Sequence, residues 1–329
     1  MSDFPCLLIR IEPQVTRVAH SCIAYVLSTG QYLWSPILTH HTIPACQQQV
    51  SGIAVLADEV FLVRQVLDGV SGYSYVYTSE LTAPEEGRPR IEVYDADTLT
   101  LQRHVDVNGL AEPWDMTSCA RYECLYVSDQ GHNGSVHRVT PDGREAATRW
   151  TVNDTPYGLS VTSDSFNVLV ACPRTRQVKE YDTRGNRVRA VTLQPDVLSS
   201  WHAVLSGGRF VVCHGGRSDP LHRVCVVDDD GTVTRSYGGA PGSANGQTSW
   251  PVRLAVDRRG YVLVADFNNK RILLLSRSLS EARELVSERD VGRSMRPMRL
   301  CLDEFRGRLY VTDEMDKDVL VFQLNVRSV

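Results

Sequence analysis

The sequence lacks several features that define common protein classes. None of its nine cysteines stands in the C-x-x-C spacing of a zinc module. No apolar run approaches the roughly 18–20 residues of a membrane-spanning helix, and no basic stretch precedes a long apolar segment at the start, as a signal peptide requires. No helical pattern of convincing length is found either. We therefore expect no zinc finger, no membrane span and no secretory leader.

The charge balance excludes a further class. With 35 Lys and Arg against 39 Asp and Glu, the formal net charge is −4, which argues against wholesale coating of nucleic acid or of an anionic membrane. A locally basic face remains possible, because a field depends on how charges are distributed. Several cysteines, such as Cys213, stand inside apolar strand-like runs, which predicts reduced core thiols in a cytoplasmic protein.

What the sequence does contain is an internal repeat. Six segments share a short alternating apolar strand, a polar turn and a second, more strongly apolar strand. They start at Val50, Pro113, Pro156, Ser200, Pro251 and Pro297. Four of the six starts are proline, which fits the beginning of a strand where no ladder N–H is needed.

Each segment is followed by a polar loop and a third strand-like run, and in all but the last unit a turn such as PDGR, TRGN or DDDGT leads to a fourth. Such turns tolerate positive φ and are strong hairpin signals. Four short antiparallel strands that recur every roughly 43–50 residues make one propeller blade. The sequence therefore predicts an all-β fold, a six-bladed β-propeller with four antiparallel strands per blade.

The predicted organisation is an N-terminal segment, residues 1–45, followed by the propeller, residues 46–329. The blades are expected at about 46–107, 108–152, 153–193, 194–238, 239–286 and 287–329. The last unit stops after its third strand, which would leave a raw sheet edge. We expect a strand from residues 1–45 to close the ring, with residues 6–12 and 22–28 as candidates. Residues 65–90 read as an exposed insertion in the first blade.

The fifth unit, from Trp250 to Ser276, resembles an NHL repeat. The matching residues are Pro251, Asp257, Gly260, Ala265, Asp266, Asn268, Arg271 and Ile272. The resemblance is fair in the second, third and sixth units and weak in the first and fourth, and it extends over residues 46–329. It implies a propeller like the C-terminal domain of TRIM-type proteins, which recruits protein or RNA targets. Ligase modules are missing here, so ubiquitin ligase activity would come from a partner acting in trans.

The candidate site lies where the six first strands begin, because these strands line the central channel. The second and third aligned positions, together with the loops between second and third strands, should meet on one face of the ring. The candidate ligand-binding residues are Trp114, Asp115, Tyr157, Trp201, His202, Arg253, Arg299, Arg174, Arg217, Phe267 and Lys270.

Two kinds of partner fit this set. Bases of single-stranded RNA stack on aromatic rings, and arginine pairs with phosphate; equally, Tyr, Trp and Arg dominate the hot spots of protein interfaces. A purely structural role is the alternative, with the rings closing the channel mouth and the two arginines paired to Asp115. For Asp266, Asn268 and Arg271 we expect that role, namely hydrogen bonds that tie adjacent blades together.

An enzyme is the alternative function. Some NHL-like rings are metal-dependent, among them an amidating lyase and calcium-dependent lactonases. A metal needs converging carboxylates or imidazoles, and here only His132, His202 and His214 could meet, beside two arginines that would repel a cation. No G-x-S-x-G motif is present. We therefore predict a monomeric, non-catalytic binding platform that holds no metal or cofactor and has no membrane partner.

Overall fold

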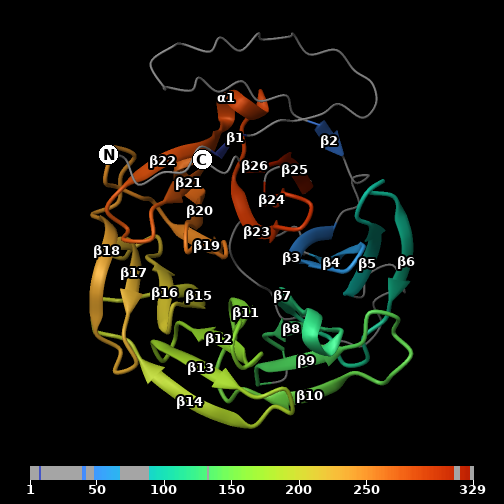
Figure 1. Cartoon of the computed structure of the whole chain (residues 1–329). Coiled ribbons are helices and arrows are strands. Elements are labelled where there is room, and N and C mark those ends of the chain that lie inside the picture. The colour runs from blue at the N-terminus through green and yellow to red at the C-terminus, as the bar shows by residue number, and fades with distance from the viewer. Residues whose placement is uncertain are drawn as a thin grey trace.

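The computed structural model describes residues 7–8, 39–41, 48–66, 89–131, 133–314 and 319–326. Six four-stranded antiparallel sheets are arranged around a central axis (Figure 1). Within the described residues the only α-helix is the four-residue α1 (Glu288–Val291). The predicted all-β, six-bladed propeller is confirmed.

The first blade contains β3 (Gln48–Leu56), β4 (Glu59–Val66), β5 (Arg90–Asp95) and β6 (Leu101–Val105). The second contains β7 (Pro113–Cys119), β8 (Cys124–Asp129), β9 (Ser135–Val139) and β10 (Thr148–Thr151). The third contains β11 (Leu159–Val161), β12 (Val168–Cys172), β13 (Gln177–Tyr181) and β14 (Arg187–Thr192).

The fourth blade contains β15 (Ser200–Ser206), β16 (Arg209–His214), β17 (His222–Val227) and β18 (Val233–Gly239). The fifth contains β19 (Pro251–Val256), β20 (Val262–Asp266), β21 (Arg271–Leu275) and β22 (Ala282–Ser287). The sixth contains β23 (Pro297–Asp303), β24 (Arg308–Asp313), β25 (Val319–Gln323) and β2 (Thr39–His41).

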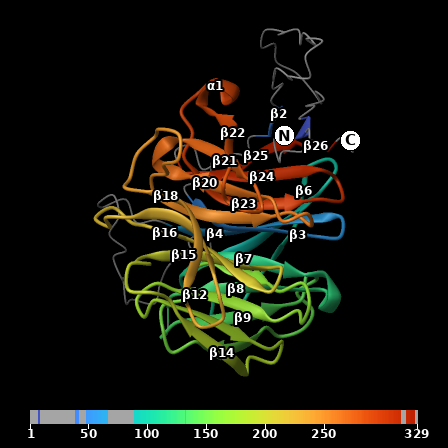
Figure 2. The same cartoon turned by 60° about the vertical axis from the view of Figure 1, so that its left-hand side comes forward.

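The strands of a blade differ in burial according to their distance from the axis. The first strands, β3, β7, β11, β15, β19 and β23, lie innermost around the centre (Figure 1), and the sheets stack face to face around it (Figure 2). The second strands β8, β12 and β20 are buried at every residue, since neighbouring blades cover both of their faces. The outermost strands β10 and β14 are mostly exposed. This explains why second strands read as apolar runs and fourth strands do not.

The polar turns between first and second strands are built from short-range hydrogen bonds. In the fifth blade, Asp257 Oδ1 accepts hydrogen bonds from the backbone N–H groups of Arg259 (3.0 Å) and Tyr261 (2.8 Å). Gly260 has a φ of +86°, a conformation that glycine adopts without steric cost. The Asp-x-x-Gly pattern of the sequence is therefore a local turn that aligns β19 with β20.

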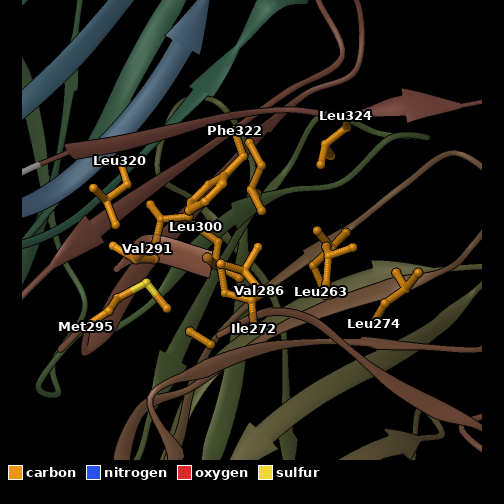
Figure 3. Packing of buried hydrophobic residues seen from close by; sticks show 14 of the residues in the cluster. Leu263, Ile272, Leu274, Val286, Val291, Met295, Leu300, Leu320, Phe322 and Leu324 are labelled. Carbon is orange, nitrogen blue, oxygen red and sulfur yellow. The ribbon is translucent and has the colours of Figure 1, made fainter. Parts of the chain in front are cut away.

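The core consists of apolar layers between adjacent blades. Figure 3 shows the layer between the fifth and sixth blades, where Leu263 and Ile272 of one sheet pack with Leu300 and Phe322 of the other. Val291 of α1 packs into the same layer. Burial of apolar surface in such layers, at about 25 cal/mol per Å², holds each blade against the next and makes the ring one cooperative body.

An N-terminal strand completes the sixth blade, as predicted, but it is neither of the two expected segments. β2 pairs antiparallel with β25, with Thr39 opposite Val321 and His41 opposite Val319. Leu7 and Leu8 instead form β1, which pairs with β26 (Asn325–Val326) in a separate two-stranded sheet. The expectation was wrong because it sought an apolar strand, whereas the outermost strand of a blade is largely exposed.

The predicted insertion in the first blade connects β4 to β5, and its residues 67–88 lie outside the described residues. The six described cysteines, Cys119, Cys124, Cys172, Cys213, Cys225 and Cys301, are free thiols, and all but Cys301 are buried.

Candidate functional site

The candidate site lies on the face of the ring where first strands begin and second strands end. An aspartate at the end of the second strand fixes the loop that enters the same blade. In three blades this carboxylate accepts a hydrogen bond from a backbone N–H. Asp129 accepts from Glu112 (2.8 Å), Asp266 from Ser249 (2.7 Å) and Asp313 from Arg296 (2.8 Å). These bonds hold rigid the loops that carry the candidate residues.

The fifth blade shows what Asp266, Asn268 and Arg271 contact. Arg271 Nε donates to Asp266 (2.8 Å), and its Nη2 donates to the carbonyl of Gln247 (3.0 Å) in the loop from the fourth blade. Asn269, rather than the predicted Asn268, also donates to Asp266 (2.8 Å). Asn268 reaches the same loop through a side-chain bond to the hydroxyl of Ser249 (3.3 Å). The motif thus ties the fourth and fifth blades together.

Three third-position side chains meet across the channel although they come from three blades. Arg253 Nη1 donates to Asp115 Oδ2, and Arg299 Nε lies 3.7 Å from Asp115 Oδ1. Arg299 also donates to the carbonyls of Ser51 and Trp114, each at 2.7 Å. Asp115 is fully buried, and Arg253 and Arg299 are 6% and 5% exposed. One carboxylate is therefore shared by two buried guanidinium groups.

His202 is the fourth polar side chain of this ring, and it is held in its neutral form. Its Nε2 lies 3.0 Å from the carbonyl of Leu159, and its Nδ1 accepts the N–H of Leu254 (3.4 Å). Burial, and then the positive charge of Arg253, lower the pKa of His202 well below its ordinary value. Both ring nitrogens are engaged, so His202 bridges the third and fifth blades as an uncharged group.

The third-position residue of the third blade, Gly158, lies against the fourth blade. A Cβ on Gly158 would lie 2.4 Å from the carbonyl oxygen of Trp201 and 2.7 Å from the ring of His202. Gly158 instead donates its own N–H to that carbonyl (3.0 Å). The absence of a side chain at this third position therefore lets the first strands of the third and fourth blades approach closely.

Asp115, His202, Arg253 and Arg299 form a group that we call the polar centre. Directly outside it, five aromatic rings form a continuous chain of contacts, which we call the aromatic arc. Its members are Trp114, Tyr157, Trp201, Trp250 and Phe267, from the second to the fifth blade. Consecutive ring centroids lie 4.9, 5.3, 5.9 and 5.2 Å apart, the separations of favourable edge-to-face and tilted pairs. The first four rings are partly exposed and Phe267 is buried.

Arginines of the sixth blade lie over both ends of the arc. The guanidinium of Arg299 is 5.2 Å from the centroid of Trp114, and that of Arg296 is 5.7 Å from the centroid of Phe267. These are cation–π distances. The arc is thus fixed at each end, and a further bond, from Trp201 Nε1 to the carbonyl of Gly215 (2.9 Å), orients its middle.

Trp250 was missed by the sequence analysis. It stands immediately before Pro251, outside the second and third aligned positions, and no other unit has an aromatic residue there. Its φ is +56°, and its backbone N–H donates to Nδ1 of His222 (2.8 Å). The sequence feature that identifies Trp250 is an aromatic residue directly before the proline that starts a first strand.

The remaining predicted residues lie at the periphery of the same face. Arg174 and Arg217 are exposed in the loops that follow β12 and β16. Arg174 donates to the hydroxyl of Thr155 (3.4 Å), and Lys270 pairs with Glu288 of α1 (3.0 Å). The structure therefore brings together Trp114, Asp115, Tyr157, Trp201, His202, Arg253, Arg299 and Phe267, and leaves the other three outside that group.

The histidines do not form a common site in the described residues. His214 is fully buried, and its Nε2 accepts from Arg223 Nε (3.1 Å). Burial, followed by the positive charge of Arg223, lowers its pKa to about 4. His132 lies outside the described residues. Among the residues described, no group of three or more His, Cys, Asp or Glu is arranged to hold a metal ion.

Comparison with known proteins supports the fold. No family model and no curated protein matches the sequence. Among solved structures, a streptogramin B lyase is 10% identical, with 88% of this chain and 98% of that chain covered and a TM-score of 0.58. A catalytically inactive virginiamycin B lyase from Staphylococcus aureus, with quinupristin, is 12% identical, with 87% and 88% covered and a TM-score of 0.55.

The WD40 β-propeller domain of Doa1 is also similar, at 13% identity, with 90% of this chain and 98% of that chain covered and a TM-score of 0.53. Likenesses at such low identity establish the β-propeller fold alone, and the same architecture accompanies both lyases and a WD40 domain. None of the helices in the described parts of the chain has the length and apolar character needed to cross a membrane.

Proposed function

We propose that this propeller is a non-catalytic binding scaffold and that a protein segment docks on the aromatic arc. The observation that supports this proposal is the continuity of the arc, in which rings from four successive blades touch one another and four of the five stay partly exposed. Pre-formed, rigid aromatic surfaces lose little conformational entropy on binding and dominate the hot spots of protein interfaces.

The state of the arginines favours protein over RNA. A strand of RNA carries a phosphate at every nucleotide, and its binding rests on several accessible cations. Arg253 and Arg299 are buried and share Asp115, so they cannot follow a phosphate backbone. The overall charge of −4 points the same way.

The resemblance of the fifth blade to an NHL repeat supports the same proposal, because NHL propellers recruit targets. Delivery of the docked protein to a ubiquitin ligase supplied in trans would be one use of such recruitment. The metal-dependent alternative is less well supported, since both ring nitrogens of His202 are engaged with backbone groups.

Selection from two pools tests the proposal. Immobilised protein is exposed in parallel to a displayed library of random peptides and to a random single-stranded RNA pool, and the same is done with Tyr157→Ala and Phe305→Ala. Tyr157 lies in the middle of the arc, whereas Phe305, 87% exposed in the turn between β23 and β24, lies at the opposite end of its blade.

We expect peptides to be enriched on the wild-type and Phe305→Ala proteins and at least tenfold less on Tyr157→Ala. A ring that anchors a partner contributes on the order of 2 kcal/mol, which is more than tenfold in affinity. Enrichment of RNA alone would replace the protein partner by RNA. Equal enrichment on all three proteins would show that the arc is not the docking surface.

A further inference from the structure

The guanidinium of Arg253 is buried with most of its hydrogen-bonding capacity unused. Its side chain is 7% exposed, and its Nη1 donates to Asp115. No other hydrogen bond to Arg253 occurs among the described residues, and its Nε is buried without a partner. A guanidinium has five N–H donors, and buried polar groups are nearly always satisfied. An acceptor from outside the chain would satisfy these donors.

The charge around Arg253 points to the nature of that acceptor. Asp115 faces both Arg253 and Arg299, so these three side chains carry an excess of one positive charge. His202 contributes no compensating charge, because it is neutral. Arg299 is held by three carbonyls in addition to Asp115, whereas Arg253 has the single bond. The excess charge is therefore least compensated at Arg253.

The polar centre and the aromatic arc are one residue apart along the same strands. Asp115 follows Trp114, and His202 follows Trp201. The guanidinium of Arg299 contacts both groups, because it lies 3.7 Å from Asp115 and 5.2 Å from the centroid of the Trp114 ring. A ligand that fits both features has an anionic group for the centre and an adjoining apolar or aromatic part for the rings. A single buried guanidinium suits one carboxylate, which it can bind through two parallel N–H···O bonds.

We propose that Arg253 binds a carboxylate of the docked protein segment, either an acidic side chain or the C-terminal carboxylate, while neighbouring apolar groups of that segment lie on the aromatic arc. This inference rests on the proposed function and names the chemistry that the scaffold selects. Peptide segments without a negative charge would dock weakly, because they leave the donors of Arg253 unsatisfied.

The first experiment uses the smallest probe that has both features. Binding of 3-phenylpropanoate and of its neutral amide to the full chain is measured by calorimetry or ligand-observed NMR at millimolar concentrations. The variants are Arg253→Met, Arg253→Lys and, as the matched control, Arg258→Met, which removes an exposed arginine from the turn between β19 and β20 of the same blade. Arg253→Met leaves Asp115 paired with Arg299, and a circular-dichroism melt checks its folding.

We expect the carboxylate to bind the wild type at least tenfold more tightly than the amide. Arg253→Met should abolish this preference, Arg253→Lys should retain part of it, and Arg258→Met should leave it unchanged. The affinities of the carboxylate and the amide for the wild-type protein test the inference even if Arg253→Met fails to fold. Equal binding of the two probes, or no binding of either, would overturn the inference.

A second experiment separates this inference from the proposed function. Peptides enriched on the wild-type protein are resynthesised with each acidic side chain changed to its amide, and separately with an amidated C-terminus. A loss of at least tenfold in one of the two forms supports the inference and identifies which carboxylate is bound. Peptides that need Tyr157 but tolerate both changes would refute it and leave the scaffold proposal standing.

Discussion

Replacing Asp115 by asparagine should destabilise the propeller more than any conservative change on its surface. The new side chain has nearly the same shape and can still accept the N–H of Leu159, which Asp115 Oδ2 binds at 2.7 Å. It removes only the negative charge. Two guanidinium groups, 6% and 5% exposed, would then lie close together without a counter-charge.

The magnitude follows from what each arginine retains. Breaking a buried ion pair by removing one partner costs about 3–5 kcal/mol. Arg299 keeps its bonds to the carbonyls of Ser51 and Trp114, which stabilise its charge in part, whereas the only described partner of Arg253 loses its negative charge. We therefore expect a loss of about 3 kcal/mol in the free energy of unfolding, near the lower end of that range.

Urea denaturation followed by circular dichroism measures this loss. The control is Asp142→Asn, because Asp142 has a half-exposed side chain in a surface pair with Arg144 and should contribute less than about 1 kcal/mol. The double variant Asp115→Asn with Arg253→Met removes one cation along with the anion and should be more stable than Asp115→Asn alone. If Asp115→Asn costs no more than the control, the charge of Asp115 does not stabilise the two buried guanidinium groups.

Two further outcomes are expected. The pKa of His214 is about 4, against an ordinary 6.5, so the unfolded chain binds the proton first. The contribution of His214 to the free energy of unfolding should be constant above about pH 6.5 and fall by about 3 kcal/mol towards pH 4. In pH-dependent melts, His214→Gln should therefore show a shallower slope than the wild type. Deletion of residues 1–45 removes β2 and should expose β25 as an open edge. We expect the truncated chain to aggregate, as measured by light scattering, or to lose its cooperative melt. A truncated chain that melts like the full one would contradict this.

Local rules predicted much of the fold from the sequence. The Asp-x-x-Gly turn at Asp257–Gly260 and the prolines at the starts of first strands each act within a few residues, so a single sequence reveals them. The strand that closes the ring was misjudged because the exposed outer position of a blade has no strong apolar signal. Thr39–His41 therefore looked less like a strand than the apolar runs before it.

The site was predictable as a set of positions but not as a set of contacts. Alignment of the repeats placed Asp115, His202, Arg253 and Arg299 on one ring, because the period assigns each residue to a blade. It did not show that Asp115 would be shared by Arg253 from the fifth blade and Arg299 from the sixth. Partners across a channel are set by side-chain length and by the space that Gly158 leaves open, and neither has a periodic signature.

The pairing of β2 with β25 has a consequence for how the molecule is made. In chain order β2 precedes the first five blades and β25 follows them, so during synthesis the ring stays open until all six blades have been made. Contacts between such distant segments form slowly, since the intervening chain must first be ordered. We therefore expect the pairing of β2 with β25 to form late, after the blades between them.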